Sequence, residues 1–183
     1  MAVKLLRAIR LDPSDTFVFE RAAEPGEWLI SGAFLFDGAS PDALPPKMRT
    51  AFRGGFLGVT SMGWSTLGLI VEASDEERQQ ASETLAANFM AVWGAPDAAT
   101  ARQAAEAELE FAASLCDHPP QTIIAVHRTF EAGEIRERFR TLTPKTGGLD
   151  TPFPVFEFYE TEAEEGPDET LSLAGLAESG GRQ

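Results

Sequence analysis

The segment from Gln121 to Leu142 constrains the fold most strongly, because apolar and polar residues alternate on both sides of one turn. The turn is Glu131-Ala132-Gly133-Glu134, and the alternation around it predicts a β-hairpin. A slip of one residue would move every side chain to the opposite face, so the pattern also predicts the register. It pairs Phe130 with Ile135, Arg128 with Glu137 and Val126 with Phe139.

The same register gathers basic and polar residues on the other face of the hairpin. They are His127, Thr129, Arg136, Arg138 and Arg140. Arginines at every second position of a strand stand about 7 Å apart, and they repel one another unless solvent, acids or an anion lies between them. A guanidinium binds carboxylate and phosphate alike, so we predict that these five residues bind an anionic ligand or partner. A solvated face paired with the protein's own acids and a nucleic-acid face are the alternatives.

The remainder of the chain predicts further strands and helices. Pro25-Gly26 suits the centre of a type II turn between two strands, and the capping-box pattern from Ser74 to Glu77 begins a helix. Prolines and glycines delimit the other elements. The predicted order is a hairpin of 16–23 and 28–36, a helix of 47–53, strands of 56–60 and 64–71, helices of 75–93 and about 98–116, and the hairpin of 121–142.

This order predicts an α+β fold. Hairpins in place of strand-helix-strand crossovers imply a mainly antiparallel sheet, built from three hairpins, with the two longer helices packed on one face. The compact domain is expected to comprise residues 1–146, because the composition then changes to proline, glycine and acidic residues.

The C-terminal tail, residues 147–183, is acidic and contains aromatic residues. It carries nine acids and one base, a net charge of −8 within a total of −14 for the 183 residues. Its predicted anchors are Phe153, Phe156, Phe158 and Tyr159. Such a segment either docks on its own domain as an edge strand or binds a partner from a mobile tail.

Composition excludes several classes of protein. Cys116 is the single cysteine, which rules out internal disulfides and a cysteine-rich zinc cage. No run reaches the roughly 18 apolar residues that span a bilayer, and Arg7 and Arg10 interrupt the position of a signal peptide. We therefore expect a cytoplasmic protein without membrane contact. An acidic chain repels phosphate backbones, so nucleic acid is not an expected partner.

No residue pattern points to catalysis, a cofactor or a metal. Cys116 and His118 lie two positions apart at a helix end, and on a helix they would point about 200° apart. The negative end of the helix dipole also raises the pKa of a thiol placed there. Gly54, Gly55 and Gly58 lack the spacing of a phosphate loop and follow a helix instead of preceding one. We therefore predict no catalytic residue, cofactor or metal ligand.

Five sequence blocks carry a resemblance to a known family. They are RLDPSDTFVFERAAEPGEW (10–28), FRGGFLG (52–58), GWSTL (63–67), SLCDHPP (114–120) and AVHRT (125–129). They resemble a small uncharacterised family of alphaproteobacterial proteins, over about residues 3–143. Genes of that family lie near a gene similar to a biotin or lipoate protein ligase. The resemblance implies a bacterial cytosolic setting and an accessory role, and it transfers no catalytic residue.

These observations support three functional hypotheses. The first is a non-catalytic accessory or interaction protein that binds an anionic partner or ligand through the arginine-rich face. The second is a small-metabolite-binding domain or enzyme, with His127 as acid and base and Arg136, Arg138 and Arg140 as clamps in a concave pocket. The third is a structural subunit whose tail adds a strand to a neighbouring chain. The sequence does not predict the oligomeric state.

Overall fold

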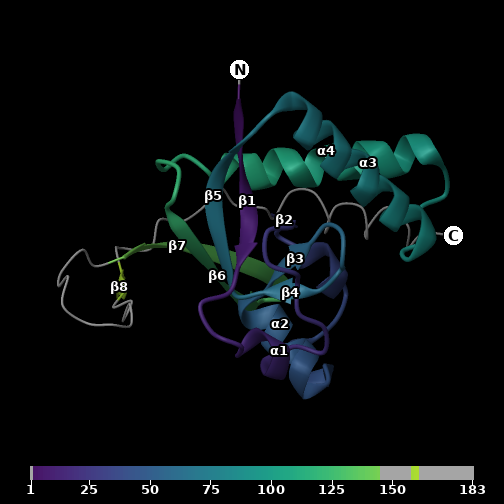
Figure 1. Ribbon diagram of the computed structural model, residues 1–183. Coiled ribbons are helices and arrows are strands. Elements are labelled where there is room, and N and C mark those ends of the chain that lie inside the picture. The colour runs from purple at the N-terminus through teal and green to yellow at the C-terminus, as the bar shows by residue number, and fades with distance from the viewer. Residues whose placement is uncertain (1, 145–157, 161–183) are drawn as a thin grey trace, which may run out of the picture.

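The computed structural model describes residues 2–144 and 158–160 (Figure 1). The strands are β1 (Val3–Ile9), β2 (Trp28–Ile30), β3 (Phe56–Gly58), β4 (Trp64–Ser65), β5 (Leu67–Ala73), β6 (Ile123–Glu131), β7 (Glu134–Pro144) and β8 (Phe158–Glu160). The helices are α1 (Asp15–Val18), α2 (Pro46–Gly54), α3 (Asp75–Ala91) and α4 (Ala98–Ser114), with the 3₁₀ turns η1 (Ala33–Phe36) and η2 (Pro41–Ala43). Within the described residues, no helix is long and apolar enough to cross a membrane.

All the strands belong to one sheet, in the order β4-β3-β2-β1-β5-β6-β7-β8. Each neighbouring pair in this order is antiparallel. The two long helices, α3 and α4, pack against each other beside the sheet, with α4 in contact with β1 and β2 (Figure 1). The predicted α+β fold with a mainly antiparallel sheet is therefore confirmed.

The sheet curls strongly where the chain passes from β4 to β5. Only Thr66 separates these strands in the chain, yet β3, β2 and β1 lie between them in the sheet. In a flat sheet, strands four positions apart would be about 19 Å apart, whereas two residues of chain span about 7 Å. The sheet must therefore bend until β4 approaches the start of β5.

The buried side chain of Asp15 holds this crossing in place. Its carboxylate accepts hydrogen bonds from Thr66 Oγ1 at 2.5 Å and from the Thr66 backbone N–H at 3.1 Å. These bonds join α1 to the single residue between β4 and β5. The predicted strand of 64–71 is consequently divided at Thr66 into two strands with different neighbours.

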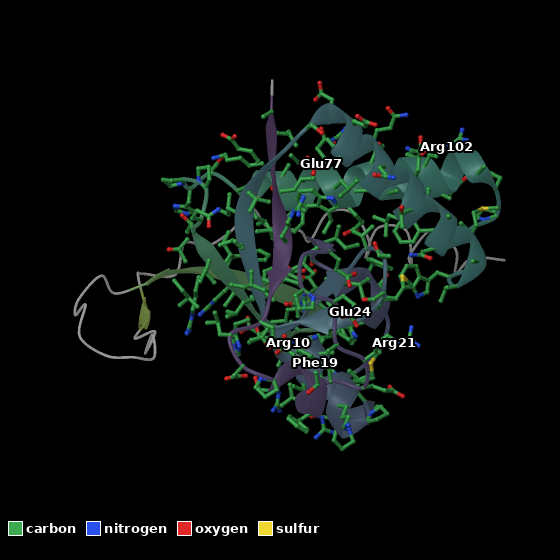
Figure 2. The ribbon with its side chains drawn as sticks, viewed as in Figure 1. Arg10, Phe19, Arg21, Glu24, Glu77 and Arg102 are labelled. Carbon is green, nitrogen blue, oxygen red and sulfur yellow. The ribbon has the colours of Figure 1, made fainter. Side chains whose placement is uncertain are left out.

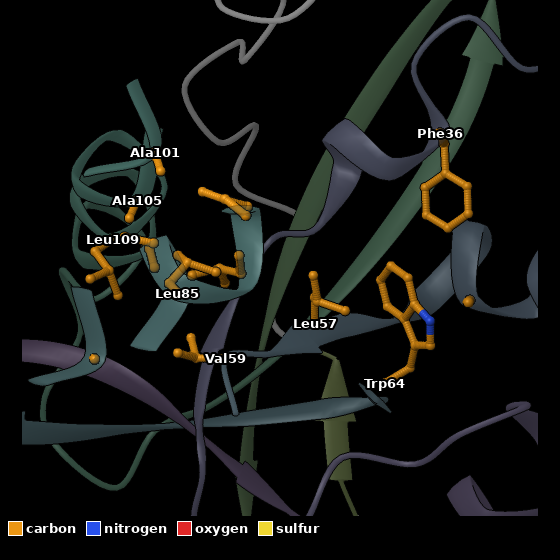
Figure 3. Close-up of a cluster of buried hydrophobic side chains, with 14 of the residues drawn as sticks. Phe36, Leu57, Val59, Trp64, Leu85, Ala101, Ala105 and Leu109 are labelled. Carbon is orange, nitrogen blue, oxygen red and sulfur yellow. The ribbon is translucent and has the colours of Figure 1, made fainter. Parts of the chain in front are cut away.

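The curl buries both faces of the central strands. Leu5 and Leu6 are consecutive in β1 and point to opposite faces, yet both are 0% exposed. Leu57 of β3 belongs to a core cluster that includes Leu85 and Leu109 of the long helices (Figure 3). A second cluster joins the sheet to the end of α4 and contains Leu6, Leu29, Phe56, Ile70, Leu115, Cys116, Ile124, Val126 and Phe139.

The first predicted hairpin is wrong in its first strand. Residues 16–23 do not form a strand, because the chain enters the short helix α1 after Pro13-Ser14. The antiparallel neighbours of β2 are instead β1 and β3. The turn before β2 is as predicted, since the Glu27 N–H donates to the Glu24 carbonyl at 3.2 Å and Gly26 has a φ of +89°.

The second strand of that hairpin ends earlier than predicted. It was expected to extend to Phe36, but β2 stops at Ile30 and the chain turns at Gly32, whose φ is +76°. A Cβ atom on Gly32 would lie 2.6 Å from Leu57 Cβ and 2.9 Å from the Trp64 ring. The close approach to these side chains therefore requires glycine, and η1 follows it instead of a strand.

The predicted helices are confirmed with small shifts at their ends. The capping box is formed, because Ser74 Oγ accepts from the Glu77 N–H and the Glu77 carboxylate accepts from the Ser74 N–H. Glu106 then links α4 to α3, accepting from Ser82 Oγ at 2.5 Å and from Arg78 at 2.8 Å. The helix pair is thus held by polar contacts at one end of its apolar seam.

Candidate functional site

The β6–β7 hairpin has the register predicted from its sequence. Ala132 and Gly133 form its turn with φ of +53° and +82°, which is the type I′ geometry suited to a two-residue loop. The observed cross-strand pairs include Phe130–Ile135, Arg128–Glu137 and Val126–Phe139. One face of the hairpin therefore turns toward the core, and the other carries the basic residues.

The five predicted binding residues share the outer face of the hairpin, which we call the basic face: His127, Thr129, Arg136, Arg138 and Arg140. His127 lies directly opposite Arg138, and Thr129 lies opposite Arg136. His127, Arg136 and Arg138 are exposed, whereas Thr129 and Arg140 are half-buried. The structure thus brings these side chains together, while their role in binding remains a prediction.

The positive charge of the basic face is only partly compensated. Arg136 Nε lies 3.2 Å from Glu131 Oε2, and the two side chains are 48% and 53% exposed. Such an exposed pair contributes about 1 kcal/mol or less. Among the described residues, the side chains of Arg138 and His127 form no hydrogen bond or ion pair. An anion that approaches this pair therefore meets donors that no described residue occupies.

One edge of β7 is open beside the basic face. β7 pairs with β6 from Glu134 to Leu142, but β8 pairs with it only at Leu142, Thr143 and Pro144. From Glu134 to Phe139 no described strand lies on that side. An edge of this kind presents backbone N–H and C=O groups that an extended segment can pair with.

The inner face of the same hairpin holds a buried arginine. Arg128 has a fully buried side chain, and its Nη1 donates to the carbonyls of Gly55, Phe52 and Ala51 at 2.7, 3.2 and 3.3 Å. These carbonyls lie at the C-terminal end of α2, where a cation is favoured by the helix dipole. Its Nη2 donates to the Ser31 carbonyl. Arg128 thus fastens α2 and the loop after β2 to the hairpin.

Two buried carboxylates lie near this guanidinium. Glu137 Oε1 is 3.5 Å from Arg128 Nε and accepts from Ser31 Oγ at 2.7 Å. Glu108 of α4 is 8% exposed, and its pKa is raised to about 7, first by burial and then by the charge of Glu137. Oε2 of Glu108 and of Glu137 have no hydrogen-bond partner among the described residues. Three charged groups therefore share a buried region beneath the basic face.

The sequence contained a signal for this buried cluster. The predicted register already put Arg128 and Glu137 on the apolar face, between the pair Phe130–Ile135 and the pair Val126–Phe139. Glu108 follows the buried Ala101 by seven residues, which is the helical repeat of one stripe. The sequence thus indicates a buried position for each of the three residues. It does not indicate that their side chains meet, because that depends on how α4 packs on the sheet.

A cleft of about 560 Å³ lies on another part of the molecule, and the sequence did not predict it. It opens between the loop after α1, helix α2, the β3–β4 turn and the end of α3. Its lining is Glu20, Arg21, Leu35, Met48, Met62, Trp64, Val92 and Trp93. Arg21 is exposed at its rim and donates to the Ser61 carbonyl at 3.2 Å (Figure 2). Apolar lining with few polar groups is typical of small-ligand sites.

The segment after α4 carries the single cysteine and one of the two histidines. Cys116 is 1% exposed, its Sγ lies 3.3 Å from the Ala112 carbonyl, and burial raises the pKa of its thiol to about 12. The His118 carbonyl accepts from Lys4 Nζ at 2.8 Å. No group of three His, Cys, Asp or Glu side chains suited to a metal ion occurs in the described residues.

The comparisons with known proteins identify the family. A model described as a family of unknown function, DUF6505, matches residues 2–157. The chain belongs to the DUF6505 family. No curated protein and no solved structure matches it. The DUF6505 match covers the β6–β7 hairpin and the buried cluster, so both features lie within the family region.

Two of the four predicted tail anchors lie outside the described residues. Phe153 and Phe156 are outside the described residues, and Phe158 and Tyr159 belong to β8, of which the backbone pairing is described. The DUF6505 match ends at residue 157, immediately before this strand.

Proposed function

We propose that this protein is a non-catalytic accessory protein that binds an acidic partner segment on the basic face. The observation that carries the proposal is the exposed pair of His127 and Arg138 beside the open edge of β7. Guanidinium and imidazole groups donate to carboxylates, and the strand edge supplies backbone groups. The setting is a bacterial cytoplasm, as the sequence resemblance implies.

The proposal selects an extended acidic peptide as the preferred ligand. A strand added to β7 would run along Arg136, Arg138 and Arg140 and could place a carboxylate opposite each second residue. Opposite-charge pairs across strands stabilise such pairing, and the backbone bonds are independent of side-chain identity. Backbone pairing together with charge pairing favours an extended acidic peptide over a compact anion as the ligand.

The experiment is a titration of the full-length protein with a fluorescent peptide of alternating glutamate and threonine. Binding should weaken as the salt concentration rises, and the pair of substitutions Arg138→Glu and Arg140→Glu should make it about tenfold weaker. Arg102→Glu, at an exposed arginine of α4 (Figure 2), is the matched control and should leave binding unchanged. Binding that is insensitive to salt, or that survives both reversals, overturns the proposal.

A second candidate function is supported by the cleft at the end of α3. Its volume falls within the range of small-molecule sites, so an apolar ligand with an anionic group for Arg21 would suit it. Neither this cleft nor the smaller one between α3 and α4 is lined by His127 or by an arginine of the basic face. A metabolite-binding site would therefore be formed by the cleft residues and not by His127 and the arginines of the basic face. We rank this function second.

An apolar fluorescent dye tests this second candidate. Val92→Lys, at the cleft wall, should reduce dye binding, whereas Leu11→Lys, at an exposed leucine that lines neither cleft, should not. Equal dye binding in the two variants would contradict a role for the cleft.

A further inference from the structure

The apolar walls of the cleft at the end of α3 contain two indole rings and two thioethers. Trp64 is 4% exposed and stacks on Phe36, with ring centroids 5.4 Å apart. Trp93 is half-buried and meets Phe34 edge to face at 5.2 Å. Other aromatic rings therefore fix the positions of both indoles. Indoles and thioether sulfur make favourable contacts with aromatic rings, so these walls suit a ligand with an aromatic body.

One of the two methionines is held in a strained conformation. Met62 lies in the β3–β4 turn with a φ of +61°, in the left-handed region that side chains disfavour. Two backbone hydrogen bonds close the turn, from the Met62 N–H to the Gly58 carbonyl at 3.1 Å and from the Gly58 N–H to the Gly63 carbonyl at 2.7 Å. Residues in such conformations are concentrated at binding and catalytic sites. The turn thus holds a thioether at the cleft.

Two side chains of opposite charge complete the lining. They are Glu20 and Arg21, and both are exposed. Arg21 Nη1 donates to the Ser61 carbonyl at 3.2 Å, which is the one hydrogen bond that its side chain forms with a described residue. The Glu20 carboxylate forms no hydrogen bond or ion pair with any described residue. The cleft therefore offers a ligand both cationic donors and an anionic acceptor.

The backbone that carries these two side chains is fixed to β4. The Trp64 N–H donates to the Arg21 carbonyl at 2.9 Å, and the Ala23 N–H donates to the Trp64 carbonyl at 2.8 Å. A Cβ atom on Gly63 would lie 2.4 Å from the Ala22 carbonyl oxygen, so the two segments pack closely. The charged side chains consequently start from a defined place at the cleft, which lowers the entropy cost of ordering them on a ligand.

The charges at the cleft favour a ligand that also carries both signs. A carboxylate pairs with a guanidinium, and an ammonium pairs with a carboxylate. A ligand with a carboxylate alone would be repelled by Glu20, and one with an ammonium alone would be repelled by Arg21. A ligand that holds the two groups next to each other satisfies both side chains.

We propose that the cleft binds a small aromatic amino acid as its zwitterion, with the carboxylate on Arg21 and the ammonium on Glu20. The aromatic side chain lies against the indoles and thioethers of the walls. A volume of about 560 Å³ accommodates a molecule of this size. The inference rests on the second candidate function, a small-molecule site in this cleft, and names the class of ligand for it.

Fluorine NMR of the full-length protein with ring-fluorinated tryptophan tests the proposal. Two analogues share the indole and lack one charge each: the N-acetyl derivative has no ammonium, and the matching tryptamine has no carboxylate. Because each analogue loses one ion pair, the amino acid should bind about tenfold more tightly than either. Equal affinities for the three probes, or no binding of the amino acid, overturn the inference.

Substitutions assign each charge of the ligand to its residue. Arg21→Gln should weaken the amino acid and the N-acetyl derivative about fivefold and leave tryptamine binding no weaker. Glu20→Gln should weaken the amino acid and tryptamine and leave the N-acetyl derivative binding no weaker. Arg53→Gln and Glu24→Gln, at exposed residues outside the cleft lining, are the matched controls and should change nothing. Losses that are the same in the cleft variants and in the controls contradict the inference.

The apolar dye separates failure of this inference from failure of the candidate function. If Val92→Lys reduces dye binding while the amino acid shows no dependence on Glu20 and Arg21, the cleft binds small molecules and the inference fails. If Val92→Lys leaves dye binding unchanged and the amino acid does not bind, both fail. The acidic peptide is unaffected by either result, because the basic face contributes no residue to the cleft.

Discussion

Arg128 and Glu137 are cross-strand partners whose buried side chains approach to 3.5 Å between Nε and Oε1. The pair lies on the inner face of the hairpin that carries the basic face on its outer side. Because Arg128 also binds four carbonyl groups from α2 and from the loop after β2, it connects three parts of the fold. These contacts hold the inner face of the hairpin against α2 and the loop after β2.

Substitution of Arg128 should therefore destabilise the protein strongly. Arg128→Met leaves the Glu137 carboxylate buried without its cation and leaves carbonyl groups unpaired, and we expect a loss of about 3–5 kcal/mol in the free energy of unfolding. Arg138→Met, at an exposed position on the outer face of the same hairpin, should change it by about 0.5 kcal/mol or less. Urea denaturation followed by tryptophan fluorescence measures both.

The double variant Arg128→Met with Glu137→Leu refines this prediction. Removal of both charges should recover part of the loss, since the buried carboxylate is gone, but not all of it, since the carbonyls of Gly55 and Ser31 stay unpaired. A loss below about 1 kcal/mol in the single Arg128 variant would show that the buried network contributes little.

Substitution of Asp15 should also destabilise the protein, through the connection from β4 to β5. Asp15→Ala deprives the Thr66 N–H and hydroxyl of their acceptor at a point where the sheet must bend, so we expect a loss of about 1–3 kcal/mol. Asp37→Ala, at an exposed aspartate, is the control and should have little effect. Thermal unfolding of the two variants provides the comparison, and equal melting temperatures would contradict a role of Asp15 in the crossing.

The hairpin of 121–142 was predictable because one of its faces is solvated. Alternation specified the register down to the pair of Arg128 and Glu137. The carbonyl partners of Arg128 were not predictable, because Gly55 and Ser31 lie 73 and 97 residues away in the chain. Only the three-dimensional packing shows that this arginine caps α2.

The strand β1 was not predicted from the sequence, because both of its faces are buried. Leu5 and Leu6 are both buried, so the segment lacks the alternation that reveals a half-exposed strand. Residues 16–23 look β-rich, but the Asp12 carboxylate accepts from the Ser14 N–H at 2.8 Å and starts a helical turn there. Phe17, inside the predicted strand of 16–23, consequently lies in α1 and is 71% exposed.

Cys116 should resist thiol reagents in the folded protein. The thiolate is the reactive form, and a pKa of about 12 leaves very little of it at pH 8. We expect modification only at the rate of unfolding, with full reaction in denaturant. A variant that carries Cys116→Ser and Ser114→Cys moves the thiol to an exposed position on the same helix end and should react at once. Rapid reaction of the natural protein would contradict the burial of Cys116.

Glu108 should make the stability of the protein fall as the pH rises. Its pKa is about 7 in the folded protein against 4.5 for an ordinary glutamate. Between these values the unfolded chain releases a proton that the folded chain retains, so the stabilisation present below pH 4.5 is lost progressively up to about pH 7. The loss should amount to about 3 kcal/mol and should level off above pH 7. Glu108→Gln cannot ionise and should lack this slope.

Urea denaturation from pH 5 to pH 8 measures the effect in both proteins. The matched control is Glu110→Gln, at an exposed position two residues further along α4, which should keep the natural slope. Subtraction of the Glu108→Gln curve from the natural one removes the contribution of the other titrating groups. If the two curves run parallel across this range, Glu108 is ionised at little cost beside Glu137, and the Arg128 charge compensates both carboxylates.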